Sequence, residues 1–381
     1  MMDDIELKNI ESRQPLMRSL SRSDSYTQED KVDTQYGSMT VAVQGERNRP
    51  AIITYHDIGL NHVSNFQAFF NFMDTRILMQ SFCVYHINAP GQEEGAPPLP
   101  DGYVYPDMDQ LAEMIMDVLK FYGLKHFVGF GVGAGGNILS RFALRHPDNV
   151  DGLFLINCCC TASGWTEWGY QKLNAMYLRS SGMTASTQDY LMWHHFGKVT
   201  EERNHDLIQV YRQYFNKSIN AKNLSMFIDT FVKRGDFGII REVDLNKKKD
   251  VKNFKCHVLL MTGALSPHLD DTVTMNSRLD PSNSTWMKLS DCGMVLEEQP
   301  GKVSEALRLF LQGLGYALNQ FRRKSSVSSC GEVPSLSSNK LLQSRQNSLE
   351  EQGDSALQGA NGNKQEVHIV ENPINQHAVT C

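Results

Sequence analysis

The sequence Gly131-Val132-Gly133-Ala134-Gly135-Gly136 follows Phe127–Phe130, a short run with the aromatic and β-branched character of a buried strand. A predicted helix, Asn137–His146, begins directly after these glycines and stops before Pro147. In serine hydrolases a sharp turn between a strand and a helix carries the G-x-S-x-G nucleophile elbow. The serine position of that motif is Gly133 here, and glycine has no side chain that attacks a substrate. The segment predicts a hydrolase scaffold that lacks its nucleophile.

Short apolar runs bounded by turn residues recur along the chain and predict the strands of a sheet. The candidate strands are 39–43, 51–55, 82–87, 127–130, 152–157, 257–261 and 285–289. Helical stretches lie between them, such as 107–122, in which apolar residues recur at helical spacing before a C-capping Gly123. This alternation predicts an α/β protein with a mostly parallel central sheet and helices on both faces.

The alternation stops in the middle of the chain. From Trp165 to about Arg234 the sequence is helical, aromatic and without strand signals, and the strands resume only at His257. Together with the elbow, this order predicts an α/β-hydrolase fold at residues 36–320, with an inserted helical cap at about 163–237.

Two segments outside this domain have a different composition. Residues 1–35 and 321–381 are rich in serine and in charged or amide side chains, and they contain few large apolar residues. Such segments bury too little apolar surface to offset the entropy of ordering. We expect a disordered N-terminal tail and a disordered C-terminal tail.

The composition also limits the class of partner. The net charge of −6 gives no general attraction to nucleic acid, so direct nucleic-acid binding is not expected. The N-terminus lacks the order of a signal peptide, and no apolar run approaches the ~20 residues of a membrane helix. The eight cysteines, three of them adjacent at 158–160, form no C-x-x-C pair. We expect a soluble, cytoplasmic protein with reduced cysteines.

Several segments resemble the N-myc downstream-regulated (NDRG) family over roughly residues 36–316. They are ITYHDIGLNH at 53–62, NAPGQEEGAP at 88–97, GVGAG at 131–135 with ILSRFAL at 138–144, HFG at 195–197, DLIQ at 206–209 and QPGK at 299–302. The resemblance implies a hydrolase fold without hydrolase activity, acting in the cytoplasm in signalling, differentiation, stress response or trafficking.

The three triad positions of this fold are predicted to be vacant. In chain order they hold a nucleophile, an acid and a histidine base. The nucleophile position is Gly133, the acid position after strand 257–261 is Ser266, and the base position after strand 285–289 is Met294. Without a nucleophile, an acid or a base, no catalytic residue is expected.

Other polar groups near these positions are alternatives. Ser140 lies on the helix after the elbow, and His268, Asp270 and Asp271 follow the acid position, where we expect loop polar groups. His56, Asp57, Gly133 and Ala134 are the candidate pocket residues. A carboxylate at Asp57 would oppose a developing oxyanion, so we expect it to cap the following helix or to bond the loop backbone.

No metal or cofactor is expected. His194 and His195 are adjacent, point to different sides of a predicted helix and have no carboxylate at i+4, so cap packing and surface exposure are favoured over metal binding. The pattern Gly131-x-Gly133-x-x-Gly136 matches the dinucleotide fingerprint formally. That fingerprint belongs to the first βα unit and needs an acidic residue about twenty positions later, which this chain lacks.

The tails carry candidate phosphorylation sites. Ser21, Ser325, Ser326 and Ser348 follow arginines at the spacing that basophilic serine/threonine kinases prefer. Phosphate would add about −1.5 to −2 charge at each site and new acceptors for arginines of a partner. The basic run 322–324 could contact anionic membranes weakly, although three charges are too few for stable anchoring.

Three functions follow from these observations. The favoured one is a non-enzymatic interaction protein whose cap and tails bind protein partners. The second is a small-molecule sensor that uses the vacated pocket, and the third is an unorthodox hydrolase. Aromatic residues of the cap suited to partner contacts are Trp165, Trp168, Tyr170, Tyr177, Tyr190 and Trp193.

Overall fold

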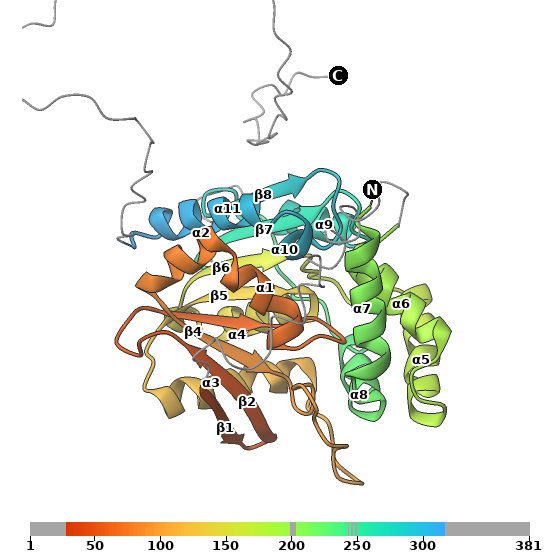
Figure 1. The fold of residues 1–381 in the computed structure, drawn as a ribbon. Helices are drawn as coiled ribbons and strands as arrows, with labels where there is room; N and C mark the ends of the chain where they lie inside the picture. The colour runs from red at the N-terminus through yellow and green to blue at the C-terminus, as the bar shows by residue number, and fades with distance from the viewer. Residues whose placement is uncertain (1–27, 199–202, 243, 245–246, 248–249, 317–381) are drawn as a thin grey trace, which may run out of the picture. The chain divides into compact units, whose positions relative to one another are not determined.

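The computed structural model describes residues 28–198, 203–242, 244, 247 and 250–316 (Figure 1). All of them lie in one of the two compact units of the chain, and the second unit, 319–367, is outside the described residues. The predicted tail at 321–381 and the candidate sites Ser21, Ser325, Ser326 and Ser348 are outside them as well.

One sheet of eight strands forms the centre of the described part. The strands are β1 (Gln28–Thr34), β2 (Gly37–Gln44), β3 (Ala51–Tyr55), β4 (Cys83–Asn88), β5 (Phe127–Val132), β6 (Val150–Ile156), β7 (His257–Gly263) and β8 (Ser284–Leu289). Their order is β1-β2-β4-β3-β5-β6-β7-β8, and β2 is antiparallel to both of its neighbours while the other pairs are parallel. The predicted strands are all present, with bounds that differ by a few residues.

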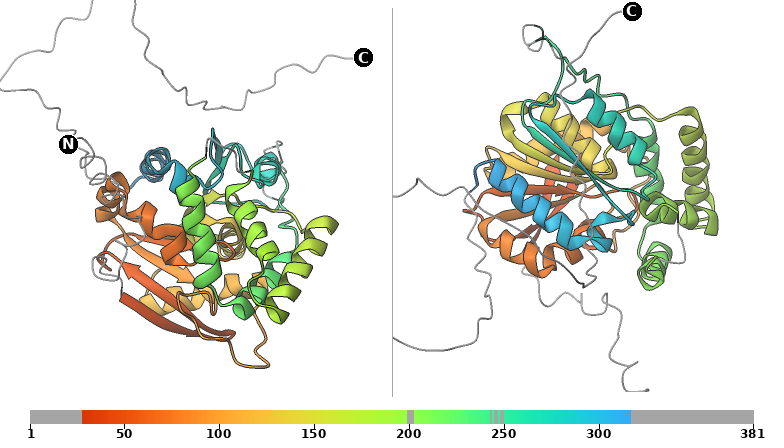
Figure 2. Two further views of the ribbon diagram at one scale, coloured as in Figure 1. Left: turned by 45° about the vertical axis from the view of Figure 1, so that its right-hand side comes forward. Right: turned by 90° about the horizontal axis from the view of Figure 1, so that it is seen from above.

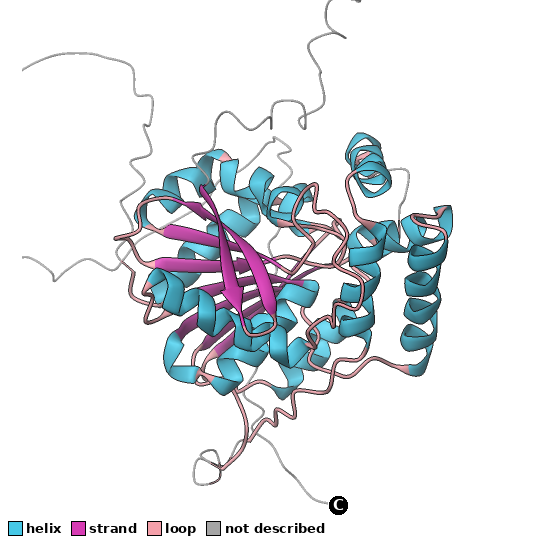
Figure 3. Cartoon of the chain, turned by 90° about the horizontal axis from the view of Figure 1, so that it is seen from below, coloured by secondary structure: helices cyan, strands magenta, loops and turns pink. Residues whose placement is uncertain are grey.

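Helices cover both faces of the sheet because strand side chains alternate between two apolar layers (Figure 3). On one face pack α3 (Met108–Tyr122), α4 (Gly133–Arg145) and α9 (Leu269–Arg278). On the other pack α1 (Ala68–Asn71), α2 (Met73–Leu78), α10 (Val295–Glu298) and α11 (Pro300–Gly313). Helix α3 begins at a capping box of Asp107 and Gln110 and ends at Gly123 in the left-handed region, the predicted C-cap.

Among the residues described between β6 and β7, the cap has four helices. They are α5 (Trp165–Ser180), α6 (Ala185–Phe196), α7 (His205–Lys217) and α8 (Ala221–Val232). Figures 1 and 2 show them together at the end of the sheet to which the parallel strands point. In an α/β sheet this end holds the ligand site, at the point where the strand order reverses. That point is β3, because β4 lies on one side of it and β5 on the other.

The prediction of disorder is wrong for the last residues of the N-terminal tail. Strand β1 begins at Gln28 and pairs with β2 along its whole length. Only Val32 of this edge strand is buried, while its other side chains are polar and at least partly exposed. The polar composition therefore concealed a strand that needs only one face covered. Residues 28–35, which were predicted to belong to the tail, are therefore part of the described domain.

Helix α4 begins earlier than predicted, at Gly133 instead of Asn137. Its first turn lies against the backbone of two strands. A Cβ at Gly131 would come within 2.5 Å of Gly136 Cα, and a Cβ at Gly135 within 2.0 Å of the Tyr55 carbonyl oxygen. The glycines are needed here because no side chain fits between strand and helix.

Among the described residues no helix is long and apolar enough to cross a membrane.

The variant Gly135→Ala tests this close packing. Its methyl group would meet backbone, which cannot turn away, so we expect the free energy of unfolding in urea to fall by about 3 kcal/mol. Gly169→Ala is the control, because Gly169 lies in α5 with no other atom within 4 Å of its would-be Cβ. This control should be neutral or more stable by up to about 1 kcal/mol. Equal losses in both variants would contradict the packing of α4 on β3.

Candidate functional site

The site lies where the loop after β3 meets the turn after β5. Gly133, at the predicted elbow position, has φ +50°, a left-handed conformation that favours glycine. A Cβ built at Gly133 would lie 2.2 Å from Cγ, Oδ1 and Oδ2 of Asp57. The carboxylate of Asp57 therefore occupies the space into which a nucleophile side chain would project.

The same carboxylate binds the two backbone donors of an oxyanion hole. Oδ1 of Asp57 accepts hydrogen bonds from Ile58 N at 2.7 Å and from Ala134 N at 2.9 Å. In α/β-hydrolases these positions, the residue after the nucleophile and the loop after β3, donate to the developing oxyanion. Here both donors are occupied by a side chain of the chain itself. The bond to Ile58 is the expected contact with the loop backbone, whereas the bond to Ala134 is additional.

The cap supplies a third partner. At the end of α6, His194 Nε2 lies 2.9 Å from Asp57 Oδ2, and His195 Nδ1 lies 3.8 Å from the same oxygen. His195 Nε2 contacts the Ile58 carbonyl oxygen at 2.9 Å. The prediction of surface exposure for these histidines is wrong, because both are buried, whereas the predicted packing is present: the His195 ring stacks on Phe215. The carboxylate that they share comes from Asp57, 137 residues earlier than His194, and not from the i+4 position of their own helix.

Two further groups hold the Asp57 loop in place. Asn65 Oδ1 accepts a hydrogen bond from Asp57 N at 2.9 Å. His56 Nδ1 donates to the Asp57 carbonyl oxygen at 2.8 Å, and its Nε2 accepts from Ala89 N at 3.0 Å. Because a carbonyl oxygen only accepts and a backbone N–H only donates, these partners fix the tautomer of His56. The loop after β3 is thus joined to the loop after β4.

Burial and neighbouring charge act on the titratable groups of the site. Burial alone would raise the pKa of Asp57, but the charge and hydrogen bond of His194, the nearby His195 and the Ala134 N–H together hold this pKa well below its usual range. Burial lowers the pKa of His56 to about 4 and that of His195 to about 3. An ionised carboxylate next to a neutral His195 is the state expected at neutral pH.

The predicted acid and base positions hold neither a carboxylate nor an imidazole. Ser266 lies in the turn after β7, where its Oγ accepts from His268 N at 3.1 Å. Met294 lies after β8 and lines a cavity together with Asp57 and His195. The volume of this cavity is about 10 Å³, which is room for one water molecule. Of the four candidate pocket residues only Asp57 borders it.

The alternative catalytic groups are engaged elsewhere. The Ser140 hydroxyl is buried and donates to the Gly136 carbonyl oxygen at 2.7 Å, within its own helix. His268 Nδ1 lies 3.5 Å from Asp271 Oδ2, and its ring packs on that of His194 with 4.5 Å between centroids. Asp270 is exposed at the start of α9. Of these groups only His268 reaches the site, as a neighbour of His194.

The loop at the base position is fastened to the cap. Glu298 Oε2 accepts hydrogen bonds from the backbone N–H groups of Gly293 and Met294, each at 2.8 Å. Arg203, at the N-terminal side of α7, binds both oxygens of Glu298 at 2.8 and 2.9 Å and donates to the Phe196 carbonyl oxygen. This buried, bidentate pair joins the cap to the loop after β8.

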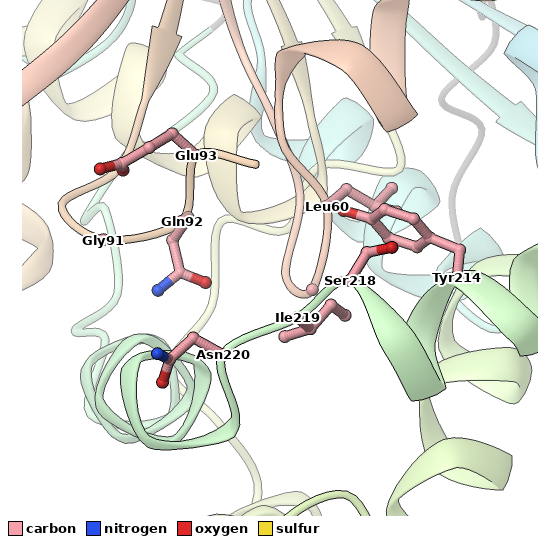
Figure 4. Close-up of a pocket in the computed structure, with 9 residues that line it drawn as sticks. Leu60, Gly91, Gln92, Glu93, Tyr214, Ser218, Ile219 and Asn220 are labelled. Atoms are coloured by element: carbon pink, nitrogen blue, oxygen red, sulfur yellow. The ribbon is translucent and has the colours of Figure 1, made fainter. Parts of the chain in front are cut away.

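A second cavity lies between the loops after β3 and β4, the last part of α7 and the loop that joins α7 to α8 (Figure 4). Its polar lining includes Gln92, Glu93, Ser218 and Asn220. Its volume is also about 10 Å³, so neither cavity admits a metabolite in this conformation.

Comparison with known proteins identifies the family. The profile of the Ndr family matches residues 29–318. The chain belongs to the Ndr family. NDRG3 of Xenopus tropicalis is 42% identical over 324 residues, 84% of this chain and 81% of that protein. NDRG1 of the same species is 44% identical over 293 residues, 76% and 72%. NDRG2 of Bos taurus is 39% identical over 327 residues, 85% and 88%. The resemblance noted in the sequence is confirmed.

Solved structures show how far the fold of this Ndr-family chain is shared. An esterase from Thermogutta terrifontis matches 75% of this chain and 99% of its own with a TM-score of 0.60 at 18% identity. The enol-lactonase from Burkholderia xenovorans matches 74% and 100% with a TM-score of 0.59 at 15% identity. These likenesses concern the fold alone, and they confirm the predicted α/β-hydrolase fold.

Removal of the Asp57 carboxylate tests its place in this Ndr-family structure. Asp57→Ala leaves two buried N–H groups and His194 without their partner, so we expect the free energy of unfolding in urea to fall by about 3 kcal/mol. Asp57→Asn keeps one oxygen for the donors and should lose about half as much. Asp117→Ala removes a partly exposed pair with Lys120 and should change stability by less than about 0.5 kcal/mol. Equal stability of Asp57→Ala and Asp117→Ala would contradict the assignment.

Proposed function

We propose that this chain is a non-catalytic member of its fold, a cytoplasmic adaptor that binds protein partners in signalling, differentiation, stress response or trafficking. The observation that carries the proposal is the carboxylate of Asp57 on the two oxyanion-hole donors, Ile58 N and Ala134 N. An acyl-transfer enzyme needs these donors free for the negative charge that develops on its substrate.

The charge of Asp57 acts against hydrolysis in two ways. A substrate carbonyl placed at the hole would meet a carboxylate that already holds both N–H groups. Its developing negative charge would also be repelled by that carboxylate at short range, in a buried setting where screening is weak. Since Gly133 offers no nucleophile either, binding of partners is the function that remains for this face of the fold.

Helix α5 supports the proposal because its apolar side faces solvent. Its buried residues are two polar ones, Gln171 and Asn174, and two apolar ones, Ala175 and Leu178. Its exposed side forms a patch that we call the α5 patch, with Trp165 89% exposed. The patch consists of Trp165, Trp168, Tyr170, Leu173, Met176 and Tyr177, with Trp193 of α6 also exposed. An exposed cluster of large apolar side chains is typical of a protein interface.

The basic side chains beside the α5 patch are already paired. Lys172 Nζ lies 2.7 Å from Asp229 Oδ1 on α8, and the guanidinium of Arg179 binds the other oxygen of Asp229. Because the carboxylate of Asp229 offsets part of this local positive charge, the attraction of the patch to an anionic surface is reduced. The patch suits the apolar face of a protein partner.

The tails would supply regulation. We propose that basophilic serine/threonine kinases modify Ser21, Ser325, Ser326 or Ser348, which lie outside the described residues. The added charge would change which partners the chain binds without a change in the folded domain. A contact of the basic run 322–324 with membranes is a weaker possibility of the same kind.

The sensor function is the second candidate. Its support is the cavity beside Asp57 and Met294, and its weakness is that this cavity holds about one water molecule. A metabolite would enter only if the cap moved away from the sheet. The Arg203–Glu298 pair and the His194–Asp57 pair both oppose that movement.

Turnover assays test the absence of catalysis. The purified full-length chain, incubated with an activated ester, a phosphoester and a fluorophosphonate probe, should show neither turnover nor labelling above a heat-denatured sample. An active serine esterase is the positive control. Stoichiometric labelling of any residue would overturn the proposal, and mapping that residue would identify the nucleophile that replaced Gly133.

Site-specific photo-crosslinking tests the α5 patch. With a benzophenone amino acid at Trp165 or Trp168 we expect discrete protein adducts in cells, because a partner covers these positions. The same residue at Phe121, which is 55% exposed on α3, is the control and should give none. Equal adducts at all three positions, or cosedimentation with anionic vesicles that Trp165→Glu abolishes, would contradict a protein-binding patch.

A further inference from the structure

Three side chains of types that bind metal ions meet at the oxyanion hole. Asp57 comes from the loop after β3, and His194 and His195 come from the last turn of α6. One ligand atom from each lies within 4.8 Å of the others, and all three residues are buried. In the part of the chain that the structure describes, no other three histidine, cysteine or acidic side chains come together in this way.

The hydrogen bonds of His195 leave one of its nitrogens facing the carboxylate as an acceptor. Its Nε2 lies 2.9 Å from the Ile58 carbonyl oxygen, so Nε2 carries the proton of the neutral ring. Nδ1 then has a free lone pair and lies 3.8 Å from Asp57 Oδ2, which also has only lone pairs. Two acceptors that face each other repel unless a cation lies between them. A backbone carbonyl on the far nitrogen is the usual support of a metal-binding histidine.

The other two ligands have the same kind of support. Oδ1 of Asp57 is fixed by Ile58 N and Ala134 N, so Oδ2 is the oxygen directed at the histidines. His194 presents Nε2 to Oδ2 at 2.9 Å, while its Nδ1 lies 3.5 Å from the Tyr190 hydroxyl. Without an ion, Nε2 donates its hydrogen bond to Oδ2; when an ion takes the place of that proton, the Tyr190 hydroxyl can accept the proton on Nδ1 and leave Nε2 as a ligand.

The spacing suits zinc. Bonds of about 2.0 to 2.2 Å in a tetrahedron place neighbouring ligand atoms about 3.3 Å apart. The separations of Asp57 Oδ2 from His194 Nε2 and His195 Nδ1, 2.9 and 3.8 Å, lie on either side of this value. The cavity bordered by Asp57 and His195 has room for one water molecule, which would be the fourth ligand.

We propose that Asp57, His194 and His195 bind one zinc ion, which joins the cap helix α6 to the elbow. Two imidazoles and one carboxylate are a donor set that proteins use for zinc. The ion would lie between Oδ2 and the two ring nitrogens, while Oδ1 stays on the backbone donors. It would therefore strengthen the contact between cap and sheet without emptying the oxyanion hole.

Metal analysis of the full-length chain tests the site. Purified after expression in zinc-supplemented medium, the wild type should retain one zinc ion per chain and melt about 5 °C or more above a sample stripped by chelator during refolding. His195→Gln, which keeps a donor for the Ile58 carbonyl, should lose this ion and the shift. His146→Gln is the control, because His146 also lies 2.9 Å from a carboxylate, that of Glu113, but has no second histidine partner. It should bind as the wild type does.

X-ray absorption at the zinc edge keeps the test decisive if the histidine variant fails to fold. The wild type should show nitrogen and oxygen neighbours only, with the outer-shell scattering of two imidazoles. Sulfur neighbours would place the ion on cysteines and overturn the proposal. Absence of zinc from the wild type after refolding in its presence, or equal zinc in His195→Gln, would overturn it too. Ester turnover by the zinc-loaded chain would contradict the proposed function instead, and leave the site standing.

Discussion

The hydrogen-bonded carboxylate of Asp57 is the interaction on which the rest of the site depends. A buried charge is strongly destabilising unless it is paired and hydrogen-bonded. Its donors come from three separate parts of the chain: Ile58 in its own loop, Ala134 at the start of α4 and His194 at the end of α6. One side chain therefore orders the loop after β3, fixes the turn after β5 and holds the cap against both. Since the same contact fills the oxyanion hole, the feature that stabilises this arrangement also removes its hydrolytic use.

Glycine makes this contact sterically allowed. At Gly133 a side chain would overlap the Asp57 carboxylate, and at Gly135 it would overlap the end of β3. A serine at the elbow and a carboxylate at the hole exclude each other without a shift of the loop. The vacant nucleophile position and the occupied donor position are thus two aspects of one arrangement. The fold is similar to that of an esterase and of an enol-lactonase at identities below 20%.

Much of the fold followed from local patterns in the sequence, but the site followed only in part. The strands with continuous apolar runs, the C-capping Gly123 of α3 and the strand-free cap were predicted from local signals that the structure confirms. Strand β1 has no such signal, because the polar composition of this edge strand resembles that of a disordered tail. The partnership of Asp57 with His194 and His195 depends on a tertiary contact across 137 residues. Helical spacing predicted that the two histidines point to different sides of α6. In the structure the Asp57 carboxylate lies close to both of them. The only local signal was the rare pair of adjacent histidines near a helix terminus.

The pair of Arg203 and Glu298 has a consequence for how the protein unfolds. Arg203 binds the cap to the loop after β8, and His194 binds it to the loop after β3. The cap is therefore held to the sheet domain at two separate loops. Each tie buries charge that becomes unpaired when the other side leaves. Cap and sheet are therefore expected to lose structure together, as one cooperative unit, rather than as a stable core with a separately melting lid.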